Sequence, residues 1–484
     1  MKANPKLLLN ALLLAVVAVF LISSCKDKDP KPIAEEYQIE DGKSSCECDS
    51  LWFPHDQTPP PKEDVGSPFD ARNTTNCIFQ QWSWQKFLWV TKPDENGLPN
   101  FLSTFDQVDS NMETPTLTKL PGTNLVLTST AQAGGGGILK TNPVYNAQLD
   151  QTETVYYGLF INDSLRQASD RFRTEILDSI LPNNNSETFP VGSVEIKSAW
   201  VNSISIPYDL LPNYYTTMAT VQKGTTVSKI KMALLGIHVV GVVINHPEFI
   251  WATFEHKDIA PTYSWDTTTV SSSAQQLLFG VATTSSLNGI NWDKTTTTPN
   301  TPNQAFTLFE YGIPRVLGGD FMLTSESGPV NHRNMSSMNE CVNTHLKDVW
   351  SNYFFNGAMW LDMDQKNHEQ QVHLIDSLSH TPNFGNASPS PKAFVRGSVS
   401  AANISMETFE QTHKTVASEI NVGNLVSCFY CHSGGNGGIS YDHYSPLYIS
   451  HIFNGFLNKA NGASDDEITA KKLKVYLKKV RMEK

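Results

Sequence analysis

Apolar residues recur at helical spacing in three segments of the chain. These segments span residues 76–90, 164–181 and 337–350, and within each the apolar positions repeat every three or four residues. The third segment opens with a capping box, in which Glu340 follows Ser337 by three positions. The pattern predicts three helices, each of which buries one apolar face.

Alternating and β-branched runs predict strands. The runs at residues 229–244 and 249–256 flank residues 245–248, which predicts an antiparallel hairpin. Pairing Asn245 with Glu248 would place His238 directly opposite Glu255, with both side chains on one face of the sheet. Helices beside a substantial sheet indicate an α+β fold. The runs are residues 154–160, 194–200, 229–244 and 249–256.

Composition divides the chain into four parts. Residues 1–24 carry Lys2 and Lys6 before an apolar run that ends in small residues, which is typical of a signal peptide. Residues 25–70 are rich in Pro, Lys, Asp and Ser, and we expect a flexible tether there. Residues 71–394 should form the strand-rich α+β body with its packing helices. Residues 395–484 should form a small, mainly helical C-terminal segment.

The end of the signal peptide, Ile22-Ser23-Ser24-Cys25, resembles the bacterial lipobox. That resemblance implies acylation of Cys25 and a lipid anchor in the membrane. The expected location is the cell envelope, as an outer-membrane or cell-surface lipoprotein, with the periplasmic face as the alternative. The apolar run itself is shorter than the roughly 20 residues that a membrane span needs.

The charge of the chain argues against a nucleic-acid partner. The full sequence carries a formal charge of -12, and removing residues 1–24 takes away two lysines and no acidic residue, which leaves -14. Proteins that bind nucleic acids present basic surfaces instead. No nucleic-acid partner is therefore expected.

The seven cysteines divide in a way that suits an oxidising compartment. Cys25 is assigned to lipid, and Cys428 and Cys431 belong to a motif described below. The remaining four can form two disulfides. Cys46 and Cys48 lie too close together in the sequence to pair comfortably, so we expect each to bond to a distant cysteine. The connectivity stays open. The four are Cys46, Cys48, Cys77 and Cys341.

The most informative motif is C-x-x-C-H at residues 428–432. Two thiols at this spacing, here Cys428 and Cys431, can bond to haem vinyl groups, while the adjacent imidazole of His432 binds the iron. The motif predicts one covalent haem c and makes residues 395–484 the haem-bearing segment. Half of a zinc site and a redox dithiol are the alternatives, although neither a second ligand pair nor a thioredoxin-like context is evident.

Two further groups of residues carry possible chemistry. The second axial ligand of the haem iron, Met406 or His451, would set the redox potential. The predicted pair of His238 and Glu255 suits proton transfer or metal binding, and it equally suits a buried structural hydrogen bond.

The helical spacing of Cys341 and His345 places both on one stripe. They are either an imidazole-activated thiolate or a core cysteine, in a disulfide, beside a histidine. An exported protein favours the second alternative.

Several segments resemble extracytoplasmic bacterial proteins of the cytochrome c family, which carry one haem motif near the C-terminus. The resemblance implies electron transfer or haem-dependent redox chemistry, with an envelope redox protein as partner, and it names no substrate. The large body leaves room for a small-molecule substrate. The alternative function is a surface ligand-binding lipoprotein in which the motif cysteines form a disulfide. The matching segments are residues 81–88, 194–200, 235–238, 249–256, 403–409 and 427–432.

Overall fold

A computed structural model of the chain describes residues 46–71, 74–130, 151–182, 185–259 and 328–377, together with shorter segments within 139–149, 276–308 and 395–460. The signal peptide, Cys25 and the first part of the expected tether lie outside these residues. Within the described part, no helix combines the length and hydrophobicity needed to cross a bilayer. All the described residues belong to one compact unit, which the contacts delimit as Asp41–Lys484.

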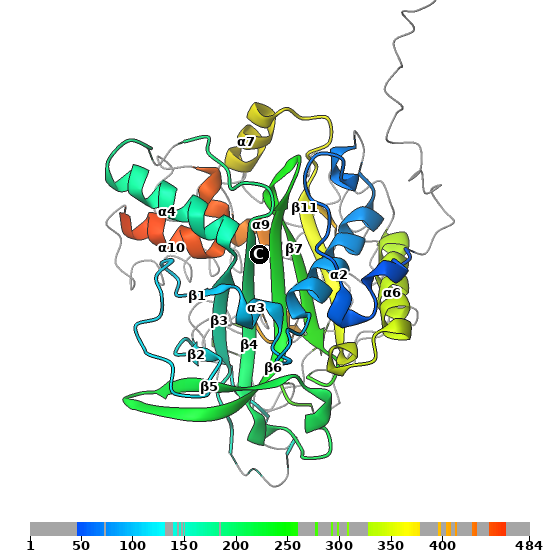
Figure 1. The fold of residues 1–484 in the computed structure, drawn as a ribbon, viewed down its shortest axis with the longest axis vertical. Helices are drawn as coiled ribbons and strands as arrows, with labels where there is room; N and C mark the ends of the chain where they lie inside the picture. Colours follow the sequence, from blue (N-terminus) through cyan, green and yellow to red (C-terminus); the bar gives the residue numbers. More distant parts are fainter. Residues whose placement is uncertain are drawn as a thin grey trace, which may run out of the picture. The chain divides into compact units, whose positions relative to one another are not determined.

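A nine-stranded sheet organises this unit, in the order β1-β3-β4-β6-β7-β11-β12, with β5 joined to β6 and β2 joined to β5 (Figure 1). The β2–β5 pair is parallel, and the other pairs are antiparallel. The strands are β1 (Asp106–Val108), β2 (Leu125–Leu127), β3 (Tyr156–Ile161), β4 (Val194–Asn202), β5 (Thr216–Lys223), β6 (Thr226–Val243), β7 (His246–His256), β11 (Tyr353–Leu361) and β12 (Val395–Gly397).

The sheet and its helices confirm the α+β expectation, and all three predicted helices are present. The second of them ends earlier than predicted, at Leu177, because Ser179 turns the chain with a φ of 60° and leaves Ile180 exposed. The third begins at Gly328, so the prediction that Ser337 caps it is wrong, and it ends at His345, before the predicted end at residue 350. The helices used below are α2 (Asn76–Thr91), α4 (Asp163–Leu177), α6 (Gly328–His345), α7 (His368–Ser377), α9 (Cys428–Cys431) and α10 (His451–Ala460).

Helix α2 covers one face of the sheet through aromatic packing. The ring of Phe87 stacks on Phe254 of β7 with centroids 4.1 Å apart, and Trp84 meets the same ring edge-on at 5.0 Å. Gly241 of β6 leaves room for Trp82, whose ring lies where a side chain at position 241 would stand. We call this side the α2 face.

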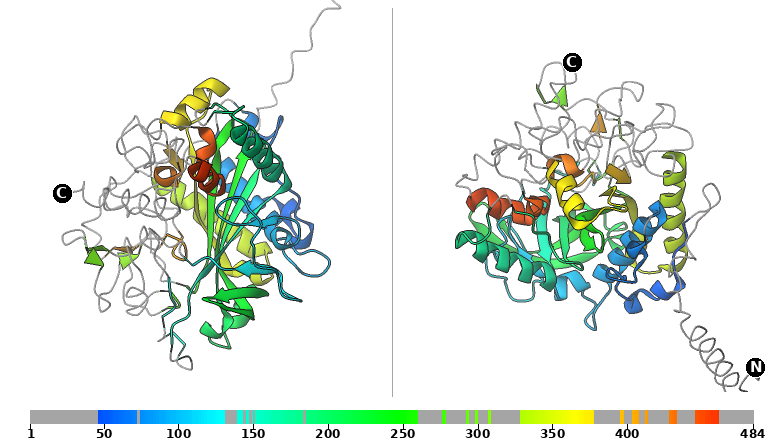
Figure 2. Two further views of the ribbon diagram at one scale, coloured as in Figure 1. Left: turned by 90° about the vertical axis from the view of Figure 1, so that its left-hand side faces the viewer. Right: turned by 90° about the horizontal axis from the view of Figure 1, so that it is seen from above.

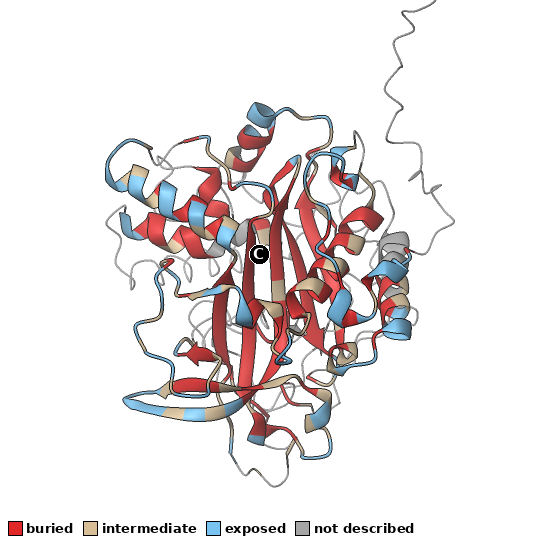
Figure 3. Cartoon of the chain, in the orientation of Figure 1, coloured by how far each residue is buried: buried red, intermediate tan, exposed pale blue. Residues whose placement is uncertain are grey.

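The opposite side of the sheet, here called the motif face, carries the alternate residues of each strand. Helix α9 lies on this side, and Figure 2 shows α2 and α9 on opposite sides of the strands. Two apolar clusters occupy the motif face. Strand β7 is buried along its whole length, and β4 is buried up to its last residue (Figure 3). The first core cluster includes Val240, Trp251, Met359, Phe429 and Phe453. The second includes Tyr157, Leu235, Ile404 and Met406.

The C-terminal segment packs into the body. Strand β12 pairs with β11, and Phe429 of α9 and Phe453 of α10 are fully buried in the first core cluster. The expected boundary after residue 394 therefore separates no independent module within the described residues, because these elements complete the core of the body.

The described part of the expected tether is folded, so the prediction of a flexible segment is wrong from residue 46 onward. Trp52 and Phe69 are buried, and the ring of Phe69 lies 5.2 Å from that of Phe79 in α2. Disulfides from Cys46 and Cys48 also tie the segment to the body. The proline-rich composition predicted an extended chain. The buried aromatic rings and the two disulfides instead hold this segment against the body.

Candidate functional site

The C-x-x-C-H motif forms one turn of helix, α9, at the edge of the first core cluster. The backbone N–H of His432 donates to the carbonyl oxygen of Cys428 over 2.9 Å, which is the hydrogen bond of a helical turn. Phe429 anchors this turn because its side chain is fully buried. Positions 428 and 431 therefore share one side of the turn, with the histidine directly after it. This arrangement of the backbone fits a haem bound through two thioethers and an axial imidazole.

The sheet supports the motif through strands β7 and β11. The imidazole of His432 stacks on the indole of Trp251 with ring centroids 4.4 Å apart and an interplanar angle of 26°. The backbone N–H of Cys428 points to the sulfur of Met359 at 3.5 Å. Trp251 and Met359 are cross-strand partners. The motif is thus seated on a single pair of neighbouring residues on the motif face.

The next residue pair along the sheet carries the predicted histidine. Val240 lies opposite Trp251, and His238 lies opposite Thr253, two positions further along both strands. Two residues along a strand span about 7 Å. The two candidate sites predicted from the sequence, the haem motif and the histidine–glutamate pair, are therefore neighbours on one face of the sheet.

The predicted register of the β6–β7 hairpin is wrong. Glu255 lies opposite Gly236, and His238 lies opposite Thr253. The chain turns earlier than expected, since Val243 pairs with His246, and an irregularity between Gly241 and Val243 then shifts the pairing. His238 and Glu255 still share the motif face, as diagonal neighbours. Each finds another partner.

Glu407, which the sequence analysis did not single out, is the partner of His238. Its Oε2 atom lies 2.9 Å from Nε2 of His238, and its Oε1 atom accepts from Nζ of Lys197 over 3.4 Å. Lys197 lies opposite His238 on β4. Sequence periodicity gives no sign of this contact, because Glu407 is 169 residues from His238 in the chain.

The residues from Asn403 to Glu407 reach the site as a turn. The side-chain amide of Asn403 donates to the carbonyl oxygen of Phe254 over 2.8 Å. A Cβ at Gly236 would meet that amide at 2.5 Å and the hydroxyl of Ser405 at 2.7 Å, so only glycine lets the turn lie on the sheet. The turn thereby brings Glu407 beside β6.

Glu255 is buried and is bound by the same turn. The backbone N–H of Ile404 donates to its Oε2 atom over 2.9 Å, while the preceding N–H, of Asn403, donates to Oε2 of Glu407 over 3.1 Å. Consecutive amides thus hold the two carboxylates side by side. We call Lys197, His238, Glu255, Asn403 and Glu407 the polar cluster.

The two carboxylates of the polar cluster differ in their affinity for protons. Burial raises the pKa of Glu255 to about 8, and the nearby charge of Glu407 acts in the same direction. Burial also penalises the charge of Glu407, but the positive charges of His238 and Lys197 outweigh this effect and lower the pKa of Glu407 to about 2. At neutral pH Glu407 is ionised, and Glu255 is mostly protonated.

The two candidates for the second axial ligand lie in different places. Met406 is fully buried in the second core cluster, whereas the motif residue Phe429 belongs to the first. His451 opens α10, directly after Ser450, whose hydroxyl donates to Glu195 over 2.7 Å. Glu195 lies on the same cross-strand row as Trp251, since both pair with Val240. The side chain of His451 is outside the described part, and both assignments stay predictions.

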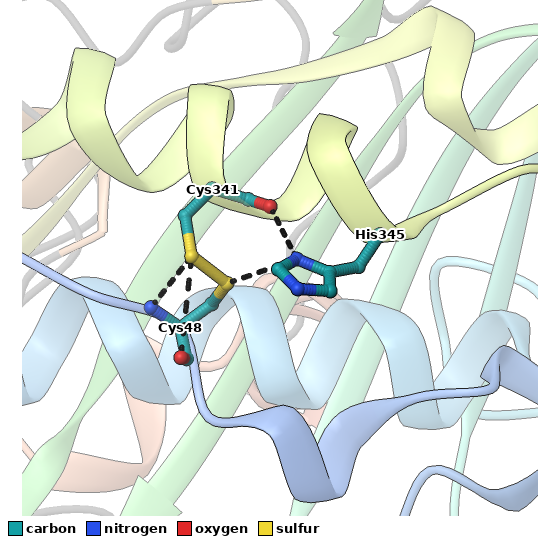
Figure 4. Close-up of side chains that lie close together, drawn as sticks. All are labelled: Cys48, Cys341 and His345. Atoms are coloured by element: carbon teal, nitrogen blue, oxygen red, sulfur yellow. Dashed lines mark hydrogen bonds between the residues drawn. A yellow bond between two sulfur atoms is a disulfide. The ribbon is translucent and has the colours of Figure 1, made fainter.

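The four remaining cysteines form the two expected disulfides, Cys46–Cys77 and Cys48–Cys341. Nδ1 of His345 lies 4.0 Å from the sulfur of Cys48 and 3.0 Å from the carbonyl oxygen of Cys341 (Figure 4). These two sulfurs and the imidazole lie within 4.8 Å of one another, which is metal-site spacing. Because the sulfurs are bonded to each other, they offer neither thiolate ligands nor a nucleophile, and the disulfide alternative is confirmed.

Comparison with protein-family models, with curated proteins and with solved structures finds no match to the chain.

Proposed function

We propose that the chain is a lipid-anchored, single-haem c-type cytochrome that passes electrons in the cell envelope. Cys428 and Cys431 would hold the haem covalently, and His432 would bind its iron. When bound, this group supplies one-electron chemistry. The protein would hold the haem in place and set the polarity of its surroundings.

The observation that carries the proposal is the stacking of His432 on Trp251. An axial imidazole needs a fixed ring orientation, and the indole at 4.4 Å provides a flat apolar support for it. Trp251 is itself held in a buried strand, with only 7% of its surface exposed. The anchoring of α9 by Phe429 adds to this preorganisation.

The disulfides and the signal sequence support the location. The described part of the structure contains two disulfides. Disulfides persist in oxidising compartments and are rare in the cytosol. The lipobox-like segment that ends at Cys25 implies attachment to a membrane. The partner of such a carrier would be another redox protein of the envelope.

A second candidate function is a haem-dependent oxidoreductase that acts on a small molecule. The position of Lys197 and His238 one residue pair from the motif support favours it, because these side chains could orient a substrate beside the haem edge. In this version His238 and Glu255 would take part in proton transfer. Binding of carbon monoxide or cyanide to the reduced or oxidised protein would favour the oxidoreductase, since it requires an accessible iron.

The test is to express the full chain in a host that matures c-type cytochromes and to measure its mass and visible spectrum. We expect one haem per chain in the wild type and none in Cys428→Ala. His345→Ala, which changes a histidine outside the motif, should load normally. A wild-type mass that lacks haem and is two hydrogens lighter at the motif would favour the ligand-binding alternative with a Cys428–Cys431 disulfide.

A further inference from the structure

Glu255 is the carboxyl group of the polar cluster that lies apart from the ion pair. Lys197 and Glu407 form an ion pair, and His238 bonds to the same carboxylate. Glu255 instead accepts from the backbone N–H of Ile404 and has no cationic partner among the described residues. Its side chain lies on the motif face, four positions along β7 from the indole that supports His432.

Polar and titratable groups of several elements lie near Glu255 on the motif face of the described residues. Strand β11 contributes an amide at a bulge, where one extra residue separates the pairs on either side. The turn contributes a carboxylate and a backbone amide. Strand β6, next to β7, contributes an imidazole, and the more distant strands β4 and β3 contribute an ammonium group and a phenol. These groups are Tyr157 of β3, Lys197 of β4, His238 of β6, Asn356 of β11, and Ile404 and Glu407 of the turn.

We propose that Glu255 couples proton uptake to electron uptake at the motif. Its carboxylate binds one proton from solvent when the group held by residues 428–432 gains one electron from an envelope redox partner, and it releases that proton when the electron leaves. The inference rests on the proposed function and adds a specific proton site to it.

The physical reason is electrostatic. An added electron makes the neighbourhood of the motif more negative, and a buried carboxylate four strand positions from Trp251 then becomes costlier to keep ionised. In a protein interior this interaction is stronger than in water. Binding a proton cancels the added charge, so one proton accompanies one electron at most.

A route for the proton exists through the partly exposed end of the cluster. The side chain of Glu407 is 25% exposed and that of His238 is 14% exposed, whereas Glu255 as a residue is only 5% exposed. Consecutive backbone amides hold the two carboxylates next to each other. Solvent therefore reaches Glu255 by way of its neighbours.

The experiment is a redox titration of the haem-loaded full chain at a series of pH values between 5 and 10. In the wild type we expect the midpoint potential to fall as pH rises around the pKa of Glu255. In Glu255→Gln the fall around that pKa should be absent. Asp258→Asn is the matched control, since it removes a partly buried carboxyl with a raised pKa beyond the end of β7. It should keep the wild-type slope.

The outcomes separate the two proposals. A chain without haem overturns the proposed function. A loaded wild type with a flat potential, or a Glu255→Gln variant that keeps the slope, overturns the proton site alone. If Glu255→Gln does not fold, infrared difference spectra of the wild type decide the matter. A protonated-carboxyl band that gains intensity on reduction supports the proposal, and its absence contradicts it.

Discussion

The imidazole of His432 stacks on the indole of Trp251, with ring centroids 4.4 Å apart. This contact joins the C-terminal motif to the centre of the sheet. It also places the motif one residue pair from His238, which lies opposite Thr253. The cross-strand pair of Val240 and Trp251 therefore supports the proposed haem site. The next pair on the same face, His238 and Thr253, belongs to the region of the polar cluster.

Replacing Trp251 should loosen the axial histidine. Trp251→Leu keeps an apolar side chain but removes the ring, whereas Trp251→Phe keeps a ring that can stack. We expect external imidazole to displace His432 at a lower concentration in the leucine variant than in the phenylalanine variant, as followed by the visible spectrum of the loaded protein. Equal sensitivity in both variants would show that stacking does not hold the histidine.

The pH dependence of the free energy of unfolding should reveal the titration of Glu255. Its pKa is about 8 in the folded chain, against 4.5 for an ordinary glutamate, so the folded state binds the proton more tightly. Its stabilising contribution is complete below pH 4.5 and is lost as pH rises through 8. The loss amounts to roughly 3 to 5 kcal/mol. Urea denaturation at pH 5 and pH 9 should show this difference in the wild type and not in Glu255→Gln.

Glu407 should behave in the opposite sense. The positive charges beside it lower its pKa to about 2 despite its burial, so its contribution is present above pH 4.5 and is lost as pH falls through 2. At pH 7, Glu407→Gln leaves the ammonium of Lys197 without its counter-charge and should cost about 1 to 3 kcal/mol. A second change, Lys197→Met, should recover part of the loss. Strictly additive effects in the double variant would contradict the ion pair.

The disulfide from Cys48 to Cys341 closes a sequence separation of 293 residues, against 31 for Cys46 to Cys77. Loop-closure entropy predicts the larger stabilisation for the longer loop, with about 4 kcal/mol for the shorter loop and about 6 kcal/mol for the longer one. Thermal unfolding of the two paired alanine variants measures the difference. A Cys46/Cys77 variant that is less stable than the Cys48/Cys341 variant would contradict this ranking.

The sequence predicted the elements better than their register. The apolar periodicity located α2, α4 and α6, and alternation located β3, β4, β6 and β7. The hairpin register failed because a slip of two residues keeps every side chain on its original face, so the apolar pattern is the same in both registers. Only the early turn, in which Val243 pairs with His246, distinguishes them.

The polar cluster was half visible in the sequence. His238 and Glu255 stood out because the alternation of the two strands places them on one face, and that face is correct. Glu407 and Trp251 were missed as site residues. Glu407 reaches His238 only because Gly236 lets the 403–407 turn lie against the sheet. Such a contact depends on tertiary packing, which has no local sequence signal.

The most direct test of the proposed function is peptide mapping of the matured, exported chain. Trypsin should release residues 415–459 as one peptide, since lysines at 414 and 459 flank a stretch that contains no other lysine or arginine. The account predicts that this peptide carries one haem through Cys428 and Cys431. The same peptide without haem, with its two cysteines joined or unmodified, would contradict it.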